Sequence, residues 1–191
     1  MKDNWIRMKL YTSSVYRVLL TKCITPLIIY GKQNCKMTNI EHIVPQSVSI
    51  DRTCTKDMHM MFLSNIYLNG IRNNYKYIDE RDIKEEDKVV MYNKDGIYEE
   101  DINRQHCGII SGKRKFIPPK DSRGIISRSI LYYRYKYGGD IKRVIDEDIL
   151  YEWGKKYKVE EEEYWRNREI YRFQENINPF IENPDLIERY I

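Results

Sequence analysis

The stretch from residue 39 to residue 74 constrains the fold of this chain more than any other part. Residues 40–44 resemble a short strand that is closed by Pro45. Residues 58–63 are apolar enough to form its buried neighbour. Ser64 is a plausible N-cap for a following helix, because its hydroxyl can accept from a free backbone N–H. The stretch therefore predicts the order strand, strand, helix, with a loop at about residues 46–56.

This stretch also carries a chemically suggestive set of side chains. Glu41 lies beside His42 at the end of the first predicted strand, and Asn69 lies on the predicted helix. An imidazole with a pKa of about 6.5 can deprotonate water near neutral pH. Mg²⁺ prefers oxygen ligands and keeps several waters, so one carboxylate and one amide carbonyl are enough to hold it. A lone histidine is more often structural, but this ordered set favours hydrolysis of a phosphodiester.

The remaining sequence predicts helices and short hairpins around this unit. Apolar spacing predicts an N-terminal helix at about residues 7–20, and residues 25–30 are strand-like, ended by Gly31. Asn93-Lys-Asp-Gly96 is a good turn between the strand-like residues 89–92 and 97–98.

Beyond Pro118-Pro119 the chain is mainly helical. The first helix starts at an N-cap of Asp121 or Ser122 and stops at Gly138. Two more helices are predicted near residues 146–157 and 160–173. We predict one α+β domain over residues 1–191, with its C-terminal helical part at about residues 121–175.

Charge is unevenly distributed along the chain. The net charge of +4 is too small to indicate nucleic-acid binding. Between Gly112 and Tyr137, however, only Asp121 is acidic and eight residues are basic: Lys113, Arg114, Lys115, Lys120, Arg123, Arg128, Arg134 and Lys136. This basic run could line a phosphate-binding face or form a solvated helix face. The acidic residues 160–163 suit the N-terminus of a helix better than a metal site.

Cysteines and apolar runs bear on the cellular compartment. Cys23, Cys35, Cys54 and Cys107 lack the C-x-x-C pairing of a metal site, and we expect reduced thiols. Charges interrupt the apolar runs near the start, so we expect no signal peptide. Residues 15–30 contain two charges and a proline, so we expect no membrane span. These features predict a soluble, intracellular protein with no membrane partner.

Several motifs, in order, resemble the endonuclease I family of nonspecific nucleases, which belongs to the ββα-metal (His-Me finger) group. They are Asn39-Ile-Glu-His-Ile-Val-Pro-Gln-Ser, Asp57-Met-His-Met-Met, Asn69-x-x-Arg72-Asn-Asn, Phe116-Ile-Pro-Pro-Lys-Asp-Ser-Arg, Trp165-Arg-Asn-Arg-Glu-Ile-Tyr and Gln174-Glu-Asn-Ile-Asn-Pro-Phe. The resemblance spans about residues 37–185 and implies a ββα-metal finger core.

The resemblance also implies roles for individual residues. His42 would be the general base, and Glu41 and Asn69 would hold Mg²⁺, with Mn²⁺ or Ca²⁺ as alternatives. Arg72 and Arg128 fall on motif arginines that would contact phosphate or make structural salt bridges. His59 would support the site through a hydrogen bond.

Other positions depart from the family pattern or match no motif. Met60 stands where the family usually has an asparagine, and Leu63 where it usually has a proline. Both changes lie beside the predicted ligand helix, so we expect them to reduce the rigidity of the site. Arg52, the one arginine of the predicted loop, is a guess for a further phosphate contact. His106 and Cys107 carry no recognised motif.

The function predicted from this resemblance is metal-dependent endonuclease activity on DNA, and on RNA as a second substrate to be tested. Sequence specificity would be low, and the products would carry 5′-phosphates. The alternative is a catalytically impaired nucleic-acid-binding protein that keeps the nuclease fold. The expected partners are nucleic acid and, as a possible regulator, an inhibitor protein; the expected oligomeric state is a monomer.

Overall fold

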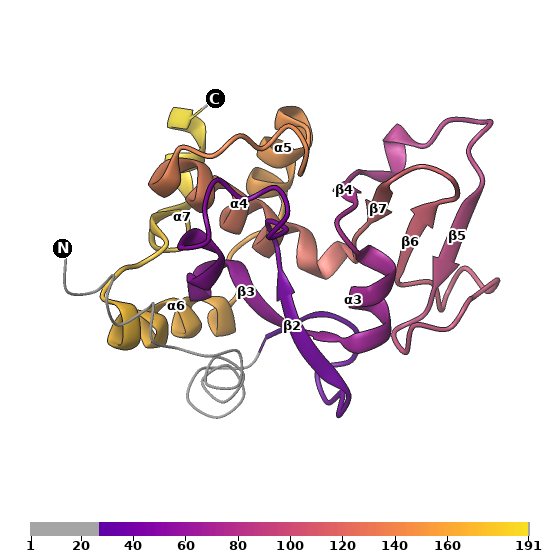
Figure 1. The fold of residues 1–191 in the computed structure, drawn as a ribbon, viewed down its shortest axis with the longest axis horizontal. Helices are drawn as coiled ribbons and strands as arrows, with labels where there is room; N and C mark the ends of the chain where they lie inside the picture. Colours follow the sequence, from indigo (N-terminus) through magenta and orange to yellow (C-terminus); the bar gives the residue numbers. More distant parts are fainter. Residues whose placement is uncertain (1–26, 191) are drawn as a thin grey trace.

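The computed structural model describes residues 27–190. In Figure 1 the helices α4–α7 gather on one side and a four-stranded sheet lies on the other, with β2, β3 and α3 between them. Helices and small sheets are thus mixed, and the predicted α+β class is confirmed. The N-terminal helix predicted at about residues 7–20 lies outside the described residues.

The first sheet carries the predicted strand–strand–helix unit. Its strands are β1 (Ile28–Tyr30), β2 (Thr38–His42) and β3 (Met61–Asn65), in the order β1-β3-β2. β2 runs antiparallel to β3, with His42 opposite Met61, and β1 runs parallel to β3. Helix α3 (Ile66–Arg72) follows β3 directly. Because β2 is an edge strand of this sheet, its last residues can border an open groove.

The second sheet is built from β4 (Lys76–Tyr77), β5 (Val89–Tyr92), β6 (Cys107–Ile110) and β7 (Lys115–Ile117), in the order β4-β7-β6-β5. The predicted hairpin is only partly correct. The turn at Asn93 forms, and Gly96 takes a φ of 82°, which favours glycine. Residues 97–98, however, contribute one isolated bridge, and β5 pairs with β6 instead.

The helices are α4 (Arg123–Tyr137), α5 (Glu147–Lys156), α6 (Glu161–Gln174) and the short α7 (Pro179–Glu182). The described chain also contains the 3-10 helices η2 (Cys54–Lys56), η3 (Met58–Met60), η4 (Glu80–Asp82), η5 (Lys120–Ser122) and η6 (Pro184–Tyr190). The bounds of α4, α5 and α6 agree closely with prediction. Ser122 is the N-cap of α4, and Gly138 ends it in the left-handed region with a φ of 66°.

Two boundaries in the strand–strand–helix unit differ from prediction, each because of a polar side chain. Asp57 accepts a hydrogen bond from the backbone of His59, so Met58–Met60 forms a 3-10 turn and β3 starts at Met61. The cap of α3 is Asn65 rather than Ser64, because Asn65 Oδ1 accepts from the N–H groups of Tyr67 and Leu68. Ser64 stays in β3, opposite Asn39.

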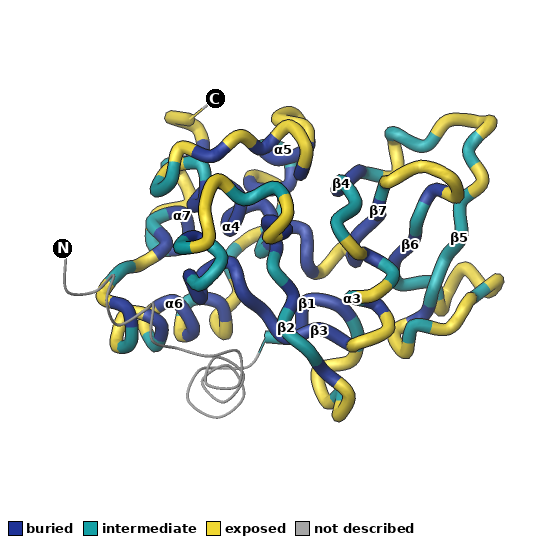
Figure 2. Tube along the Cα trace, viewed as in Figure 1, coloured by how far each residue is buried: buried dark blue, intermediate teal, exposed yellow. Residues whose placement is uncertain are grey.

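The buried parts of the chain hold this unit in place. In Figure 2 the buried trace runs through β1, β3 and α4, and all five residues of β3 are buried. Asp57, also fully buried, accepts hydrogen bonds from Tyr132 and Tyr137 of α4 and from Gln174 of α6. Both helices are therefore tied to the chain segment that leads into β3.

Candidate active site

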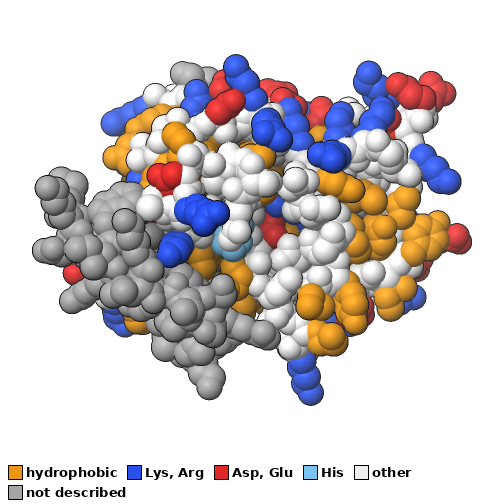
Figure 3. Space-filling view, viewed as in Figure 1, with side chains coloured by type: hydrophobic (Ala, Val, Ile, Leu, Met, Phe, Trp, Pro, Cys, Tyr) orange, Lys and Arg blue, Asp and Glu red, His pale blue; other side chains and the backbone are white. Residues whose placement is uncertain are grey.

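A groove of about 760 Å³ lies between the end of β2 and α3, and it brings four of the predicted site residues together. Glu41, His42, Asn69 and Arg72 all line it, together with Gln46. In the space-filling view, a histidine is exposed in a hollow near the centre of the molecule, with basic side chains to its left (Figure 3).

His42 lies half-buried at the end of β2. Its Nε2 is 3.1 Å from the side-chain nitrogen of Gln46, which can donate to a neutral ring. Burial lowers the pKa of His42 below its usual 6.5, although a hydrogen bond to the backbone of Thr55 acts in the opposite direction. The imidazole is therefore neutral near pH 7 and able to accept a proton.

Glu41 is a buried residue that also lines the groove. Its Oε1 lies 3.2 Å from Arg72 Nε, 3.4 Å from the hydroxyl of Tyr30 and 3.5 Å from that of Tyr77. Burial raises the pKa of Glu41 to about 7, while Arg72 acts in the opposite direction. A divalent cation at this carboxylate would favour its charged form and displace the proton.

Asn69 is oriented by the neighbouring strand. Its amide nitrogen donates to Asn39 Oδ1 at 2.8 Å and to the carbonyl of Ile40 at 3.2 Å. Among residues 27–190, these hydrogen bonds use only the nitrogen, which leaves the carbonyl oxygen of Asn69 to face other ligands. The described chain holds no group of three or more His, Cys, Asp and Glu side chains suited to a metal. One carboxylate plus one amide oxygen does fit Mg²⁺, which commonly retains waters.

Arg72 lies beneath the groove and is 1% exposed. It donates to the carbonyls of Ile43 and Asn73, each at 2.8 Å, and its guanidinium lies 4.8 Å from the centre of the Tyr77 ring. Its Nε pairs with Glu41 by distance but makes no well-formed hydrogen bond in the described structure. Of the two roles predicted for Arg72, these contacts are those of a structural salt bridge, here with Glu41.

Arg128 and His59 lie away from this groove. Arg128, 1% exposed, forms two hydrogen bonds of 2.7 and 2.6 Å with the carboxylate of Glu163. His59 is buried, with Nε2 3.1 Å from the carbonyl of Asn176 and its ring against Tyr132. Burial lowers the pKa of His59 to about 4, so it is neutral near pH 7. Of the two roles predicted for Arg128, its contacts are those of a salt bridge.

Most basic residues of the run between Gly112 and Tyr137 are paired with acidic side chains. Five of its eight basic residues form ion pairs: Lys113, Arg123, Arg128, Arg134 and Lys136. One of their partners, Glu163, comes from the acidic block, which forms the first turn of α6 as predicted. The run is therefore neither a continuous phosphate-binding face nor a simple solvated helix face.

The positions that depart from the family pattern lie in apolar packing. Met60 belongs to the main core, and Leu63 packs in a second apolar cluster beside Ile28 and Ile170. Arg52 is exposed, in the same loop as Thr55. Cys35, Cys54 and Cys107 are free thiols.

Four residues of the site were missed by sequence reasoning. They are Tyr30 and Tyr77 at Glu41 and Gln46 and Thr55 at His42. Of these, only Gln46 belongs to a motif that resembles the family, so the sequence offered a signal for this residue alone. The tyrosines come from β1 and β4, and no local spacing links them.

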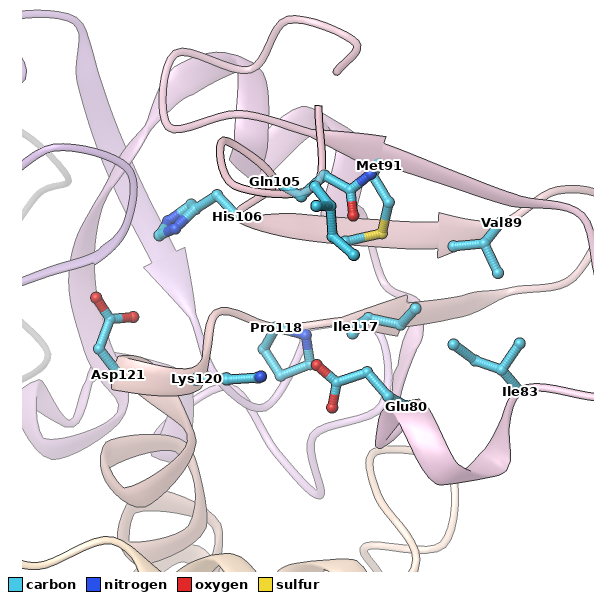
Figure 4. A pocket seen from close by; sticks show the side chains of 11 residues that line it. Glu80, Ile83, Val89, Met91, Gln105, His106, Ile117, Pro118, Lys120 and Asp121 are labelled. Atoms are coloured by element: carbon cyan, nitrogen blue, oxygen red, sulfur yellow. The ribbon is translucent and has the colours of Figure 1, made fainter. Parts of the chain in front are cut away.

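A separate cavity of about 800 Å³ lies against the second sheet (Figure 4). His106 lines it and points toward Asp121, and its Nε2 accepts a hydrogen bond from the backbone of Gly31. Burial lowers the pKa of His106 to about 4. The cavity shares no lining residue with the groove at His42, and the hydrogen bond of His106 is to the residue that follows β1.

Within residues 27–190, no helix is long and apolar enough to cross a membrane.

The sequence model of the endonuclease I family matches residues 2–185. An extracellular deoxyribonuclease of Aeromonas hydrophila is 33% identical over 130 residues, which cover 66% of this chain and 48% of that protein. A periplasmic deoxyribonuclease of the same organism is 32% identical over 130 residues, with coverages of 66% and 47%.

The chain thus spans about half the length of the curated relatives it matches. Their names give no support to the predicted intracellular location, which stays a prediction. The family match, by contrast, covers almost the whole chain, and it includes every residue of the groove. The chain belongs to the endonuclease I family.

Proposed function

We propose that this protein is a metal-dependent endonuclease that hydrolyses phosphodiester bonds of DNA. One observation carries the proposal: a neutral imidazole, a carboxylate and an amide carbonyl line a single groove, at His42, Glu41 and Asn69. That set provides one base and two hard oxygen ligands, which are the parts that hydrolysis of a phosphodiester needs.

His42 would act as the general base. Because its ring is neutral near pH 7, Nε2 can take a proton from a water that attacks the phosphorus. The hydrogen bond with the Thr55 backbone fixes the orientation of the ring, as a backbone partner commonly does for a catalytic histidine. The Gln46 amide nitrogen lies 3.1 Å from the same Nε2, so it would have to move aside for the attacking water.

Glu41 and Asn69 would hold the metal, with Mg²⁺ as the expected ion and Mn²⁺ or Ca²⁺ as alternatives. Glu41 supplies a charged oxygen, and Asn69 supplies a neutral one whose direction is set by its bonds to Asn39 and Ile40. When bound, the cation would supply positive charge to the phosphate and to the departing O3′. The departing O3′ would take up a proton from solvent, which leaves a 3′-hydroxyl on one fragment and a 5′-phosphate on the other.

DNA is the proposed substrate because both matched relatives are named deoxyribonucleases. Low sequence specificity is proposed because the groove is formed by an edge strand and a helix of seven residues, which offer little surface to read base edges. RNA is a second substrate to compare under the same conditions.

The deciding experiment is plasmid nicking with Mg²⁺ and with EDTA, for the wild-type protein and for His42→Ala. We expect Mg²⁺-dependent nicking by the wild type and a loss of about 10²–10⁴-fold in the variant. His106→Gln is the matched control, because it removes a histidine outside the groove while its amide oxygen can still accept from the backbone of Gly31. Full activity of His42→Ala would refute the base assignment. A wild-type protein that binds DNA without cutting it would support the alternative of an impaired nuclease fold.

A further inference from the structure

Several buried groups converge on one oxygen of Glu41. The hydroxyls of Tyr30 and Tyr77 lie 3.4 and 3.5 Å from Oε1, and Arg72 Nε lies 3.2 Å from the same atom. Tyr30 and Tyr77 are 0% exposed, and Glu41 is 2% exposed. The other oxygen, Oε2, receives none of these three contacts, and Glu41 itself lines the groove.

The two hydroxyls are bonded to each other as well. Their oxygens are 2.6 Å apart, and either one can be the donor. Each hydroxyl has one proton, so the donor of this bond has none left. The acceptor keeps its proton free and can direct it to Oε1. The pair therefore offers one hydrogen bond to Glu41 at a time, and either tyrosine can provide it.

Packing accounts for the rings of these tyrosines but not for their hydroxyls. Both rings pack edge-on against Phe116. The centre of the Phe116 ring lies 5.1 Å from that of Tyr30 and 6.2 Å from that of Tyr77. Phenylalanine at either position would preserve these contacts. A buried hydroxyl needs a polar partner, and here the partners are the other hydroxyl and Glu41.

We propose that the hydroxyl pair of Tyr30 and Tyr77 is a positioning device that fixes the inner oxygen of Glu41 and presents the outer one to a divalent cation. This proposal rests on the metal-dependent function proposed above. Tyr30 belongs to β1 of the first sheet and Tyr77 to β4 of the second. The orientation of the metal ligand is thus set where the two sheets meet, rather than by the motif that contains it.

The proton count gives a distinctive expectation for three variants: Tyr30→Phe, Tyr77→Phe and the double variant. In each single variant the remaining hydroxyl turns its proton to Oε1, so the affinity for Mn²⁺ should fall by about threefold or less. The double variant leaves Arg72 and the His42 backbone as partners of the Glu41 carboxylate. Its affinity for Mn²⁺ should fall about 10–100-fold, as is usual when a ligand loses its supporting hydrogen bond. The double loss should therefore exceed the product of the single losses.

The measurement is binding of Mn²⁺ alone to the full chain, followed by the electron paramagnetic resonance signal of the free ion. Tyr133→Phe is the matched control, because it removes a buried tyrosine hydroxyl that bonds the backbone of Ile50, outside the groove. Melting temperatures of all variants show whether each is folded. A second readout is the Mg²⁺ concentration that gives half-maximal nicking, which should rise in the double variant and not in the control.

The outcomes separate this proposal from the one on which it rests. Wild-type nicking and Mn²⁺ binding together with an unchanged double variant would overturn the role of the pair alone. A single variant as weak as the double would also overturn it, since the two hydroxyls would not be interchangeable. A wild-type protein that neither binds Mn²⁺ nor nicks DNA with Mg²⁺ would overturn the metal site and the pair with it.

Discussion

Removal of Arg128 should destabilise the protein without weakening its affinity for DNA. The guanidinium of Arg128 on α4 forms two short hydrogen bonds with Glu163 on α6, and the side chains are 2% and 3% exposed. It also donates to the carbonyl of Tyr157 at 2.7 Å. Gly124 leaves room for it, because a Cβ there would lie 2.8 Å from Nη2 of Arg128. The pair joins two helices inside the protein, outside the groove at His42.

The magnitude follows from what the substitution leaves behind. Arg128→Met would leave the Glu163 carboxylate buried without its counter-charge, and loss of one partner of a buried pair costs about 3–5 kcal/mol. For a chain of this size, about 2–4 °C is lost per kcal/mol, which gives a fall in melting temperature of roughly 6–20 °C. Arg128→Met combined with Glu163→Leu removes both charges and should recover most of this loss, since an apolar pair of similar volume is often neutral.

The assay is thermal unfolding, with urea unfolding as a second measure, followed by tryptophan fluorescence for Arg128→Met, Glu163→Leu and the double variant. DNA affinity is measured separately in EDTA, at a temperature at which every variant is folded. Arg134→Met is the matched control, because its ion pair with Glu147 is 39% and 52% exposed and should contribute little. Unchanged unfolding of Arg128→Met, together with a loss of DNA affinity, would refute the structural reading and restore the phosphate role.

Two further predictions concern the groove. Asn69→Ala should raise the Mg²⁺ concentration needed for half-maximal nicking about 10-fold or more, because a ligand is lost while Glu41 remains; an unchanged Mg²⁺ titration would remove Asn69 from the site. The same half-saturating concentration should fall as pH rises from about 6 to about 8, because the pKa of Glu41 is raised to about 7 and protons compete with the cation below that value. A titration that is flat across this range would contradict the pH argument.

Much of the fold could be predicted because its signals are local. The helix after Pro118-Pro119 has an apolar stripe and a glycine stop, and α4 ends at Gly138 as that pattern indicates. The boundaries that failed depended on a choice between neighbouring polar side chains. Asn65 caps α3 in place of Ser64, and Asp57 turns residues 58–60 into a 3-10 helix. Such choices depend on tertiary partners: Tyr132, for example, donates to Asp57 from 75 residues away.

The candidate site divides in the same way. Glu41 and His42 could be proposed because they are adjacent in one motif, and Asn69 because it follows on the next helix. The sequence left two interpretations of the basic run open, because charge counts ignore partners that are distant in sequence. Glu163 neutralises Arg128 from 35 residues away, and no spacing rule connects the two.

Met60 and Leu63 were expected to question the rigidity of the groove, and their positions argue against a loss of rigidity. Each is a large apolar side chain in apolar packing, one in the main core and one in the second cluster. Asn69 is held instead by the Asn65 cap of its helix and by its own bonds to β2. The two proposed metal ligands thus belong to one strand–helix unit. In the protein interior this unit is held by the hydroxyl pair at Oε1 of Glu41. Substitutions at the junction of the two sheets should therefore weaken metal binding more than the presence of Met60 or Leu63 does.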